Sequence, residues 1–344
     1  MHRPDRRGIL SAAGGGAMAA ALPPPPQSPP SWGRREVSRE ETAALHRAVA
    51  AVRHADSRHG GGSDQAQAAA HLLDQWVRPL LGRALTESRE RELCAVSAEL
   101  ARLAGWAALD TGHHTTARRH LDRALFWARA ADDPDLMTYV LTTTALHTTL
   151  YGRPRAALAL TAAALDAGRH RAHPRVRGFA KLVQARAHAR EGDAGAAGRS
   201  LSAAERLLVR PCAHGTPEWI DFFTRPRLAA DAAEIHRDLG NVRACLSWHE
   251  QASAMAPNAF TRSVGLRLTV VATAHLQARD LEQSLAAGHR ALDILRDVDS
   301  RRARDYVRRL ATGLAPHRAL GAVDGFLARL QQEFAPAART APVP

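Results

Sequence analysis

The chain has 344 residues, a formal net charge of +13 and only 5% aromatic residues. Ala, Leu and Arg dominate, and because these residues favour helices whereas aromatic and β-branched residues favour strands, the composition predicts an all-α fold. The three cysteines (Cys94, Cys212 and Cys245) form no CxxC pair and no run of about 18 apolar residues occurs, so a disulfide framework, a cysteine-based zinc site and a membrane span are not expected.

Residues 1–35 are rich in Gly and Pro, and we expect them to form a disordered tail or linker. Within them, Arg6, Arg7 and a small-residue apolar segment ending near Ala21 are similar to a twin-arginine export signal. Glycines interrupt the apolar segment, which weakens this reading. We therefore expect a cytoplasmic protein, with export and cleavage near Ala21 as the alternative.

From Ser38 onward, segments of helical length alternate with short Gly, Asp or Pro breaks. We expect five helical hairpins, at 89–111 with 115–131, 134–150 with 154–169, 175–190 with 194–209, 217–238 with 242–255, and 260–278 with 281–297. Helices near 38–55, 64–82, 301–313 and 321–333 should cap the two ends, because an open end exposes apolar surface. Residues 334–344 are expected to form a disordered tail.

A turn residue recurs between the two helices of each hairpin, at Gly112, Gly152, Gly192, Gly240 and Arg279. The spacings of 40, 40, 48 and 39 residues are typical of stacked helical hairpins, and a longer loop at 210–217 explains the value of 48.

Small residues occupy three fixed positions around every turn, as the close crossing of two helices requires. They are Gly105, Ala145, Ala185, Ala233 and Ala272 before the turns, and Ala117, Ala157, Ala197, Cys245, Ser284, Ala124, Ala164, Ala204, Ala252 and Ala291 after them. The pattern predicts a tetratricopeptide-like helical-hairpin solenoid, a right-handed superhelix, over residues 36–333. Its repeats lie near 98–131, 138–171, 178–211, 226–257 and 265–298.

In such a superhelix the first helix of each hairpin lines the concave face. The side chains expected there are Glu99, Arg102, Trp106, Tyr139, Phe179, Arg186, Arg190, Glu234 and Arg237. Aromatic and arginine side chains in a groove suit a peptide, an acidic segment or another ligand. The alternative is that the aromatic residues only pack between helices. Asparagines of the kind that hold a peptide backbone are absent from the middle of the groove, since the chain has only Asn241 and Asn258.

The histidines form no convincing set of metal ligands, although His113, His114 and His120, and His170 with His173, lie close in sequence. Three others, His188, His236 and His275, share one repeat position and are expected to pack between helices. We expect no metal and no cofactor.

A run of arginines (Arg301, Arg302, Arg304, Arg308 and Arg309) falls on one of the last predicted helices. It could contact phosphates, but such a run is more often a solvated face. Motifs for nucleotide binding and for a serine nucleophile are absent from the sequence, so we expect no enzyme.

Several stretches are similar to the C-terminal tetratricopeptide-like region of bacterial XRE-type helix-turn-helix transcriptional regulators. They are ELARLAGW at 99–106, TPEWIDFF at 216–223, APHR with GFLARL between 315 and 330, and HGGG at 59–62. The resemblance covers roughly residues 36–333.

That resemblance implies the sensing and partner-binding half of a regulator. In the family a DNA-binding helix-turn-helix precedes the repeats, but none is visible at 1–62, where Arg6, Arg7 and Leu10 match the family's linker. We therefore expect DNA binding only indirectly or through a missing upstream segment; a paralogue without a DNA reader is the other explanation.

The expected function is regulation by binding a protein, peptide or small-molecule ligand in the concave groove, without a membrane. A homodimer is left open. An exported or cytosolic scaffold for protein–protein interaction is the first alternative, and an enzyme is the second.

Overall fold

The structure is a computed structural model that describes residues 38–81, 86–213 and 215–334. Every regular element in these ranges is helical, so the predicted all-α class is confirmed for the described part of the chain. None of its helices is both long and apolar enough to cross a bilayer. The expected N-terminal tail with its Arg6-Arg7 signal and the C-terminal tail after Phe334 lie outside the described residues.

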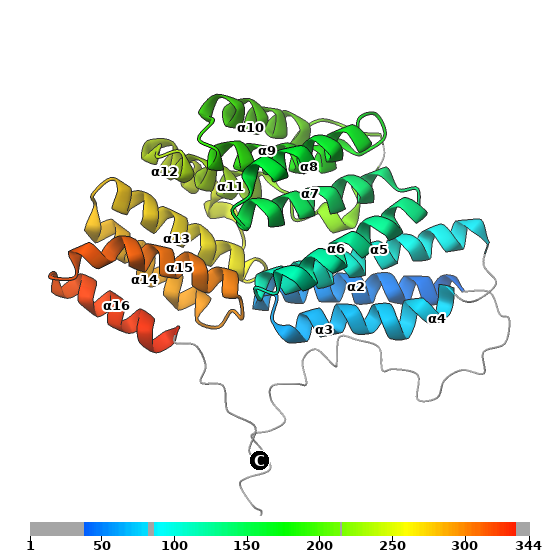
Figure 1. Cartoon of the computed structure of the whole chain (residues 1–344), viewed down its shortest axis with the longest axis horizontal. Coiled ribbons are helices and arrows are strands. Elements are labelled where there is room, and N and C mark those ends of the chain that lie inside the picture. The colour runs from blue at the N-terminus through cyan, green and yellow to red at the C-terminus, as the bar shows by residue number, and fades with distance from the viewer. Residues whose placement is uncertain (1–37, 82–85, 214, 335–344) are drawn as a thin grey trace, which may run out of the picture.

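Helices pack as neighbouring pairs along most of the chain (Figure 1). The pairs are α5 (Glu87–Asp110) with α6 (His114–Ala130), α7 (Pro134–Leu150) with α8 (Pro154–Ala167), α9 (Pro174–Arg190) with α10 (Ala194–Leu208), α11 (Arg225–Asp238) with α12 (Val242–Gln251), and α13 (Thr261–Gln277) with α14 (Leu281–Leu295). Their bounds agree with the five predicted hairpins within a few residues, except at the start of α11.

Shorter and terminal elements complete the structure. Before the pairs come α2 (Arg39–His59), α3 (Ser63–His71), a π-helical segment (Leu72–Val77) and α4 (Arg78–Leu81), and after them come α15 (Arg301–Leu314) and α16 (Gly321–Glu333). Short 3-10 turns lie at Glu218–Ile220, Ala252–Ala254 and Ala315–His317.

The predicted helix over 217–238 starts too early in the chain. In the structure, the corresponding helix α11 begins at Arg225. The Thr224 side chain accepts a hydrogen bond from the Arg227 amide, and a proline occupies the first turn. The residues before it form a short 3-10 turn that buries Trp219 and Ile220, followed by a turn in which Phe223 is also buried. Burial of these apolar side chains outweighs the helical pattern of the segment.

All five predicted turn residues adopt a left-handed backbone conformation. The φ angles are +82° at Gly112, +78° at Gly152, +80° at Gly192, +72° at Gly240 and +63° at Arg279. Glycine favours this conformation because it has no Cβ, and a residue in it commonly ends a helix. The turns between the paired helices are thus confirmed.

Small residues at the fifteen predicted positions are all buried. At Gly105 an added Cβ would lie 3.0 Å from the Leu121 side chain and 3.2 Å from the Ala117 carbonyl oxygen. The two helices of a pair therefore approach closely at these positions, as the sequence pattern predicts.

The pairs follow one another around an arch, and the C-terminal helices come to lie beside the N-terminal ones (Figure 1). Helix α13 packs against α2, and α15 packs against α5. Between these ends, the Asp299 amide donates a hydrogen bond of 2.9 Å to the His59 carbonyl oxygen. The arch is therefore closed by contacts between segments that lie far apart in the sequence.

The HGGG stretch lies at this junction, and its glycines are explained by close approach. A Cβ added to Gly60 would lie 2.4 Å from the Asp299 carbonyl oxygen, and one added to Gly61 would lie 2.6 Å from the Asp110 Cβ. We call the set Asp56, Gly60, Gly61, Gly62, Asp110, Arg262, Asp299 and Arg302 the closing contact.

Candidate functional site

A cavity of about 180 Å³ lies on the inner side of the arch. First helices of three successive pairs contribute to its wall, together with α2, the loop before α11 and the start of α13. The aromatic residues of the wall are Trp106, Tyr139, Phe179, Phe222 and Phe260, and its arginines are Arg53, Arg102, Arg227 and Arg262.

The aromatic part of the wall is held in place by other rings packed behind it. Trp219 stacks on Tyr139 with ring centroids 4.7 Å apart, and Phe223 packs against Phe179 at 5.5 Å. Phe222 meets the Phe179 ring edge-on at 5.4 Å. Such ring pairs add to the stability gained by burial, so the cavity has a preformed apolar side.

Arg102 differs from the other arginines of the wall. It is 4% exposed, and its guanidinium carbon lies 4.6 Å from the centroid of the Tyr139 ring. Its buried Nε has no hydrogen-bond partner, which is also true of Arg53 and Arg262. The difference is that Arg53, Arg227 and Arg262 each form an ion pair, whereas Arg102 forms none among the described residues. The nearby Arg53 instead reaches Glu99 at 3.4 Å.

Glu99 lies near both of these arginines in a fully buried position. Burial raises the pKa of Glu99, and attraction to Arg53 and Arg102 offsets this effect only in part. The carboxyl group therefore holds its proton more readily than an exposed glutamate does, which weakens it as a counter-ion.

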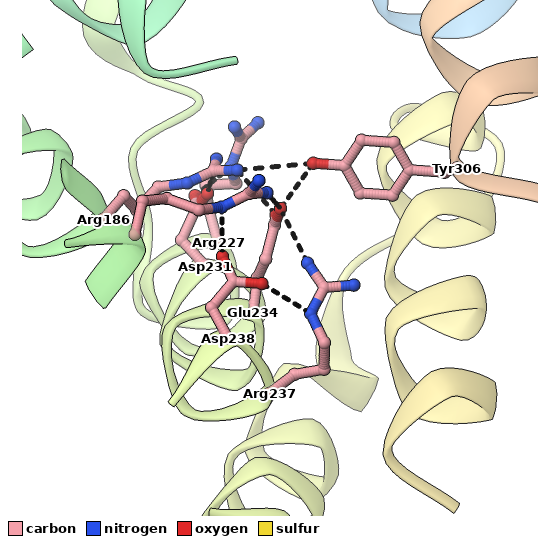
Figure 2. Close-up of polar contacts among 8 residues, drawn as sticks. Arg186, Arg227, Asp231, Glu234, Arg237, Asp238 and Tyr306 are labelled. Atoms are coloured by element: carbon pink, nitrogen blue, oxygen red, sulfur yellow. Dashed lines mark hydrogen bonds and ion pairs between the residues drawn. The ribbon is translucent and has the colours of Figure 1, made fainter. Parts of the chain in front are cut away.

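A second cluster lies deeper in the arch, where α9, α11 and α15 meet (Figure 2). Arg186 contacts Asp231 at 2.6 Å and Glu234 at 2.7 Å, and the Tyr306 hydroxyl donates to Glu234. Burial by itself would raise the pKa of Glu234, but Arg186 and Arg237 outweigh it and hold that pKa well below its usual range. The cluster is a buried ion-pair network that joins three helices.

Asp110 is the centre of a third cluster, within the closing contact. It is 0% exposed and accepts hydrogen bonds from Arg262 at 2.9 Å, Arg302 at 2.8 Å and the Gly61 amide at 2.8 Å. Burial opposes ionisation, but the two arginines and the amide lower the pKa of Asp110 to about 2. Arg262 also pairs with Asp56, which lines the cavity.

All nine side chains predicted for the concave face lie on first helices of their pairs. The structure divides them into two groups. The first group lies at the cavity and consists of Arg102, Trp106, Tyr139 and Phe179, with Glu99 beside it. The second group belongs to the ion-pair network and consists of Arg186, Arg190, Glu234 and Arg237. Members of the second group bond to one another and to α15. Tyr139 and Phe179 both pack in the core and line the cavity.

Several residues that build these clusters were missed by sequence reasoning. They are Asp56, Asp110, Phe222, Arg227, Asp231, Arg262 and Tyr306. One signal was present, since Asp110 follows Leu103, Trp106 and Ala107 on one face of α5, where an acidic residue needs a partner.

The arginine run on α15 is only partly a solvated face. Arg304 and Arg308 form ion pairs at the surface. Arg302 instead turns inward, where its guanidinium carbon lies 5.1 Å from the Trp106 ring centroid and its Nε meets Asp110. The expectation of a solvated face is wrong for Arg302, because the opposite end of the arch supplies a buried carboxylate.

His114 and His147 lie side by side. Their ring nitrogens are 3.3 Å apart, and burial and the neighbouring His114 lower the pKa of His147 to about 4. No group of three or more His, Cys, Asp or Glu side chains suited to a metal ion occurs in the described part of the chain.

The cavity wall places flat apolar faces beside guanidinium groups. Such a wall can hold a ligand by stacking and by charge-assisted hydrogen bonds. Comparison with known proteins adds no family: no family model matches the chain, and no curated protein matches it significantly.

Proposed function

We propose that this chain is a regulatory binding module with a tetratricopeptide-like solenoid fold, and not an enzyme. It binds a ligand or a short partner segment on the inner side of its arch. The paired helices, the left-handed turns and the buried small residues support the solenoid. The resemblance to the C-terminal region of XRE-type regulators supports a role in transcriptional control.

The observation that carries this proposal is the cavity on the inner side of the arch. Its wall combines residues of α5, α7 and α9 with residues of α2 and α13, which belong to opposite ends of the chain. Ligand pockets are usually lined by apolar and aromatic groups with a few polar groups that fix orientation. The aromatic and arginine side chains described above form such a lining.

Regulation follows from the position of the cavity beside the closing contact. Asp56 and Arg262 line the cavity and also join α2 to α13. A ligand that fits the closed arch adds contacts that are lost when the ends separate. Since a ligand shifts an equilibrium by its differential affinity for two states, binding would favour the closed arch and the surface it presents to a partner.

Native purification from the host tests the proposal. The chain is purified without denaturation, and small molecules released on unfolding are identified by mass spectrometry. Ser263→Leu replaces a small polar side chain in the cavity wall by a larger apolar one, whereas Ser202→Leu makes the same change at an exposed position of α10.

We expect wild type and Ser202→Leu to carry the same small molecule and Ser263→Leu to lack it. Failure of all three to carry a molecule, together with no rise in melting temperature when low-molecular-mass host extract is added, would contradict ligand binding at this cavity.

A further inference from the structure

We propose that the cavity takes a small monoanion with a flat apolar body, an aromatic carboxylate in chemical class, and that Arg102 binds its negative group. This inference rests on the proposed function and names the ligand class for the same cavity. Its body would lie among the rings of Trp106, Tyr139 and Phe179.

Arg102 is a buried guanidinium group without a hydrogen-bond acceptor. A buried charge is costly unless it is paired and hydrogen-bonded. Arg102 is almost completely buried, yet it lacks a hydrogen-bonding acceptor among the described residues, and its contact with the Tyr139 ring supplies no lone pair. The side chain lines the cavity. An anion bound there would supply the missing acceptor.

Two of the carboxylates near the cavity are already paired with other arginines. Asp231 is shared by Arg186 and Arg227, and Asp110 is shared by Arg262 and Arg302. Each of these carboxylates already serves two guanidinium groups.

Three other acidic groups lie at the cavity. Asp56 and Asp221 line its wall, where Asp56 is paired with Arg262, and Glu99 lies beside Arg102 but is directed to Arg53. Four arginines and two aspartates line the cavity, so its wall carries more positive than negative charge, which favours an anionic ligand over a neutral or cationic one.

The size of the cavity suits a small ligand with an apolar ring. The volume is about 180 Å³, slightly above that of an engineered apolar cavity of about 150 Å³ that binds benzene. Pockets for drug-sized ligands are larger, at roughly 300–1,000 Å³. A single ring with one anionic group suits the space, whereas a peptide of several residues does not.

Calorimetric titration of the full chain tests the ligand class with three probes. Benzoate has both the ring and the charge, benzamide has the ring without the charge, and inorganic phosphate has charge without the ring. We expect benzoate to bind and the other two to bind at least about 10-fold more weakly, because a charge-assisted hydrogen bond and ring burial each contribute that much.

Two variants assign the effect to one side chain. Arg102→Gln is expected to weaken benzoate binding by about 10- to 100-fold, the equivalent of losing hydrogen bonds to a charged group. Arg177→Gln is the matched control, since it removes a charge from a half-buried arginine on α9 whose Nε is also without a partner but which does not line the cavity. We expect Arg177→Gln to bind benzoate as wild type does.

Thermal unfolding without ligand separates binding from a structural role. Arg102 has no hydrogen-bonding acceptor among the described residues, so Arg102→Met loses only the contact with the Tyr139 ring and the attraction to Glu99. The melting temperature should therefore change little, and only the rise caused by benzoate should disappear. A large fall in the melting temperature of Arg102→Met, or equal benzoate binding by Arg102→Gln and wild type, would overturn the assignment of Arg102.

The probes also separate this inference from the proposed function. Equal binding of benzoate and benzamide would overturn the anionic class while leaving the cavity a ligand site. If benzoate does not bind at millimolar concentration, the inference fails, and a host-derived molecule that Ser263→Leu loses would still support the proposed function.

Discussion

Replacing Asp110 by asparagine tests the closing contact by removing its central charge with little change in shape. The carboxylate is fully buried and serves Arg262, Arg302 and the Gly61 amide. One pKa unit corresponds to about 1.4 kcal/mol, so the lowering of the pKa from 3.8 to about 2 corresponds to about 2 kcal/mol of folding stability. Removing one partner of a buried ion pair costs about 3–5 kcal/mol.

We expect a loss of about 2–3 kcal/mol for Asp110→Asn, because asparagine keeps one acceptor and Arg262 keeps Asp56. The assay is urea unfolding of the full chain at neutral pH, followed by far-ultraviolet circular dichroism. Asp305→Asn is the control, since this half-exposed aspartate on the neighbouring α15 forms only a surface ion pair. Its expected cost is below about 1 kcal/mol.

The pH dependence gives a second readout of the same group. The pKa of Asp110 is lower in the folded chain than its ordinary value, so its contribution is complete above about pH 4 and is lost as the pH falls toward about 2. Asp110→Asn should lack this part of the acid destabilisation. Equal stabilities of Asp110→Asn and Asp305→Asn, with identical acid profiles, would refute the role assigned to the closing contact.

Three further changes test the packing and the turns by the free energy of unfolding in urea. Gly61→Ala should lower the free energy of unfolding by about 3 kcal/mol, because its Cβ would lie 2.6 Å from another side chain. Gly152→Ala should lower it by about 1 kcal/mol, for its positive φ alone. Equal losses would contradict the close approach at Gly61. Ala157→Leu should cost about 3 kcal/mol at a buried helix crossing, and Ala156→Leu, exposed on the same helix, less than about 0.5 kcal/mol. Arg279→Gly should stabilise the chain by up to about 1 kcal/mol, because it relieves a left-handed non-glycine residue; destabilisation would argue against that backbone conformation.

The helical pairs were predictable because their signals are local in sequence. A left-handed turn favours glycine at one position, and two helices that cross closely need small residues at fixed distances from it, as Gly152 and Ala157 illustrate. The start of α11 was mispredicted because burial of Trp219 and Phe223 overrides the helical pattern of the preceding residues. The tetratricopeptide-like superhelix stays a prediction.

The site was predictable only in part, for a physical reason. Repeat position places Arg102 and Arg186 on first helices, and so toward the inner side of the arch. It does not say which charge each one meets, because Arg262 finds Asp110 across 152 residues and Asp56 across 206 residues. Partners at such separations depend on how the whole arch closes.

Likewise, the sequence distinguishes poorly between an arginine that is paired and one that is not. Arg102 on α5 and Arg186 on α9 both lie on first helices, yet only Arg186 meets carboxylates on the first helix that follows its own. The difference comes from the side chains on the following first helix. Arg102 contacts Tyr139 of α7, whereas Arg186 contacts Asp231 and Glu234 of α11.

The most direct measurement is a high-resolution crystal structure of the full chain purified natively from its host. We predict density for a small molecule in the cavity, with an anionic group within hydrogen-bond distance of Arg102 and a flat body against Trp106 and Tyr139. A collapsed cavity, with Arg102 hydrogen-bonded directly to Glu99 and no space between the rings, would contradict the account.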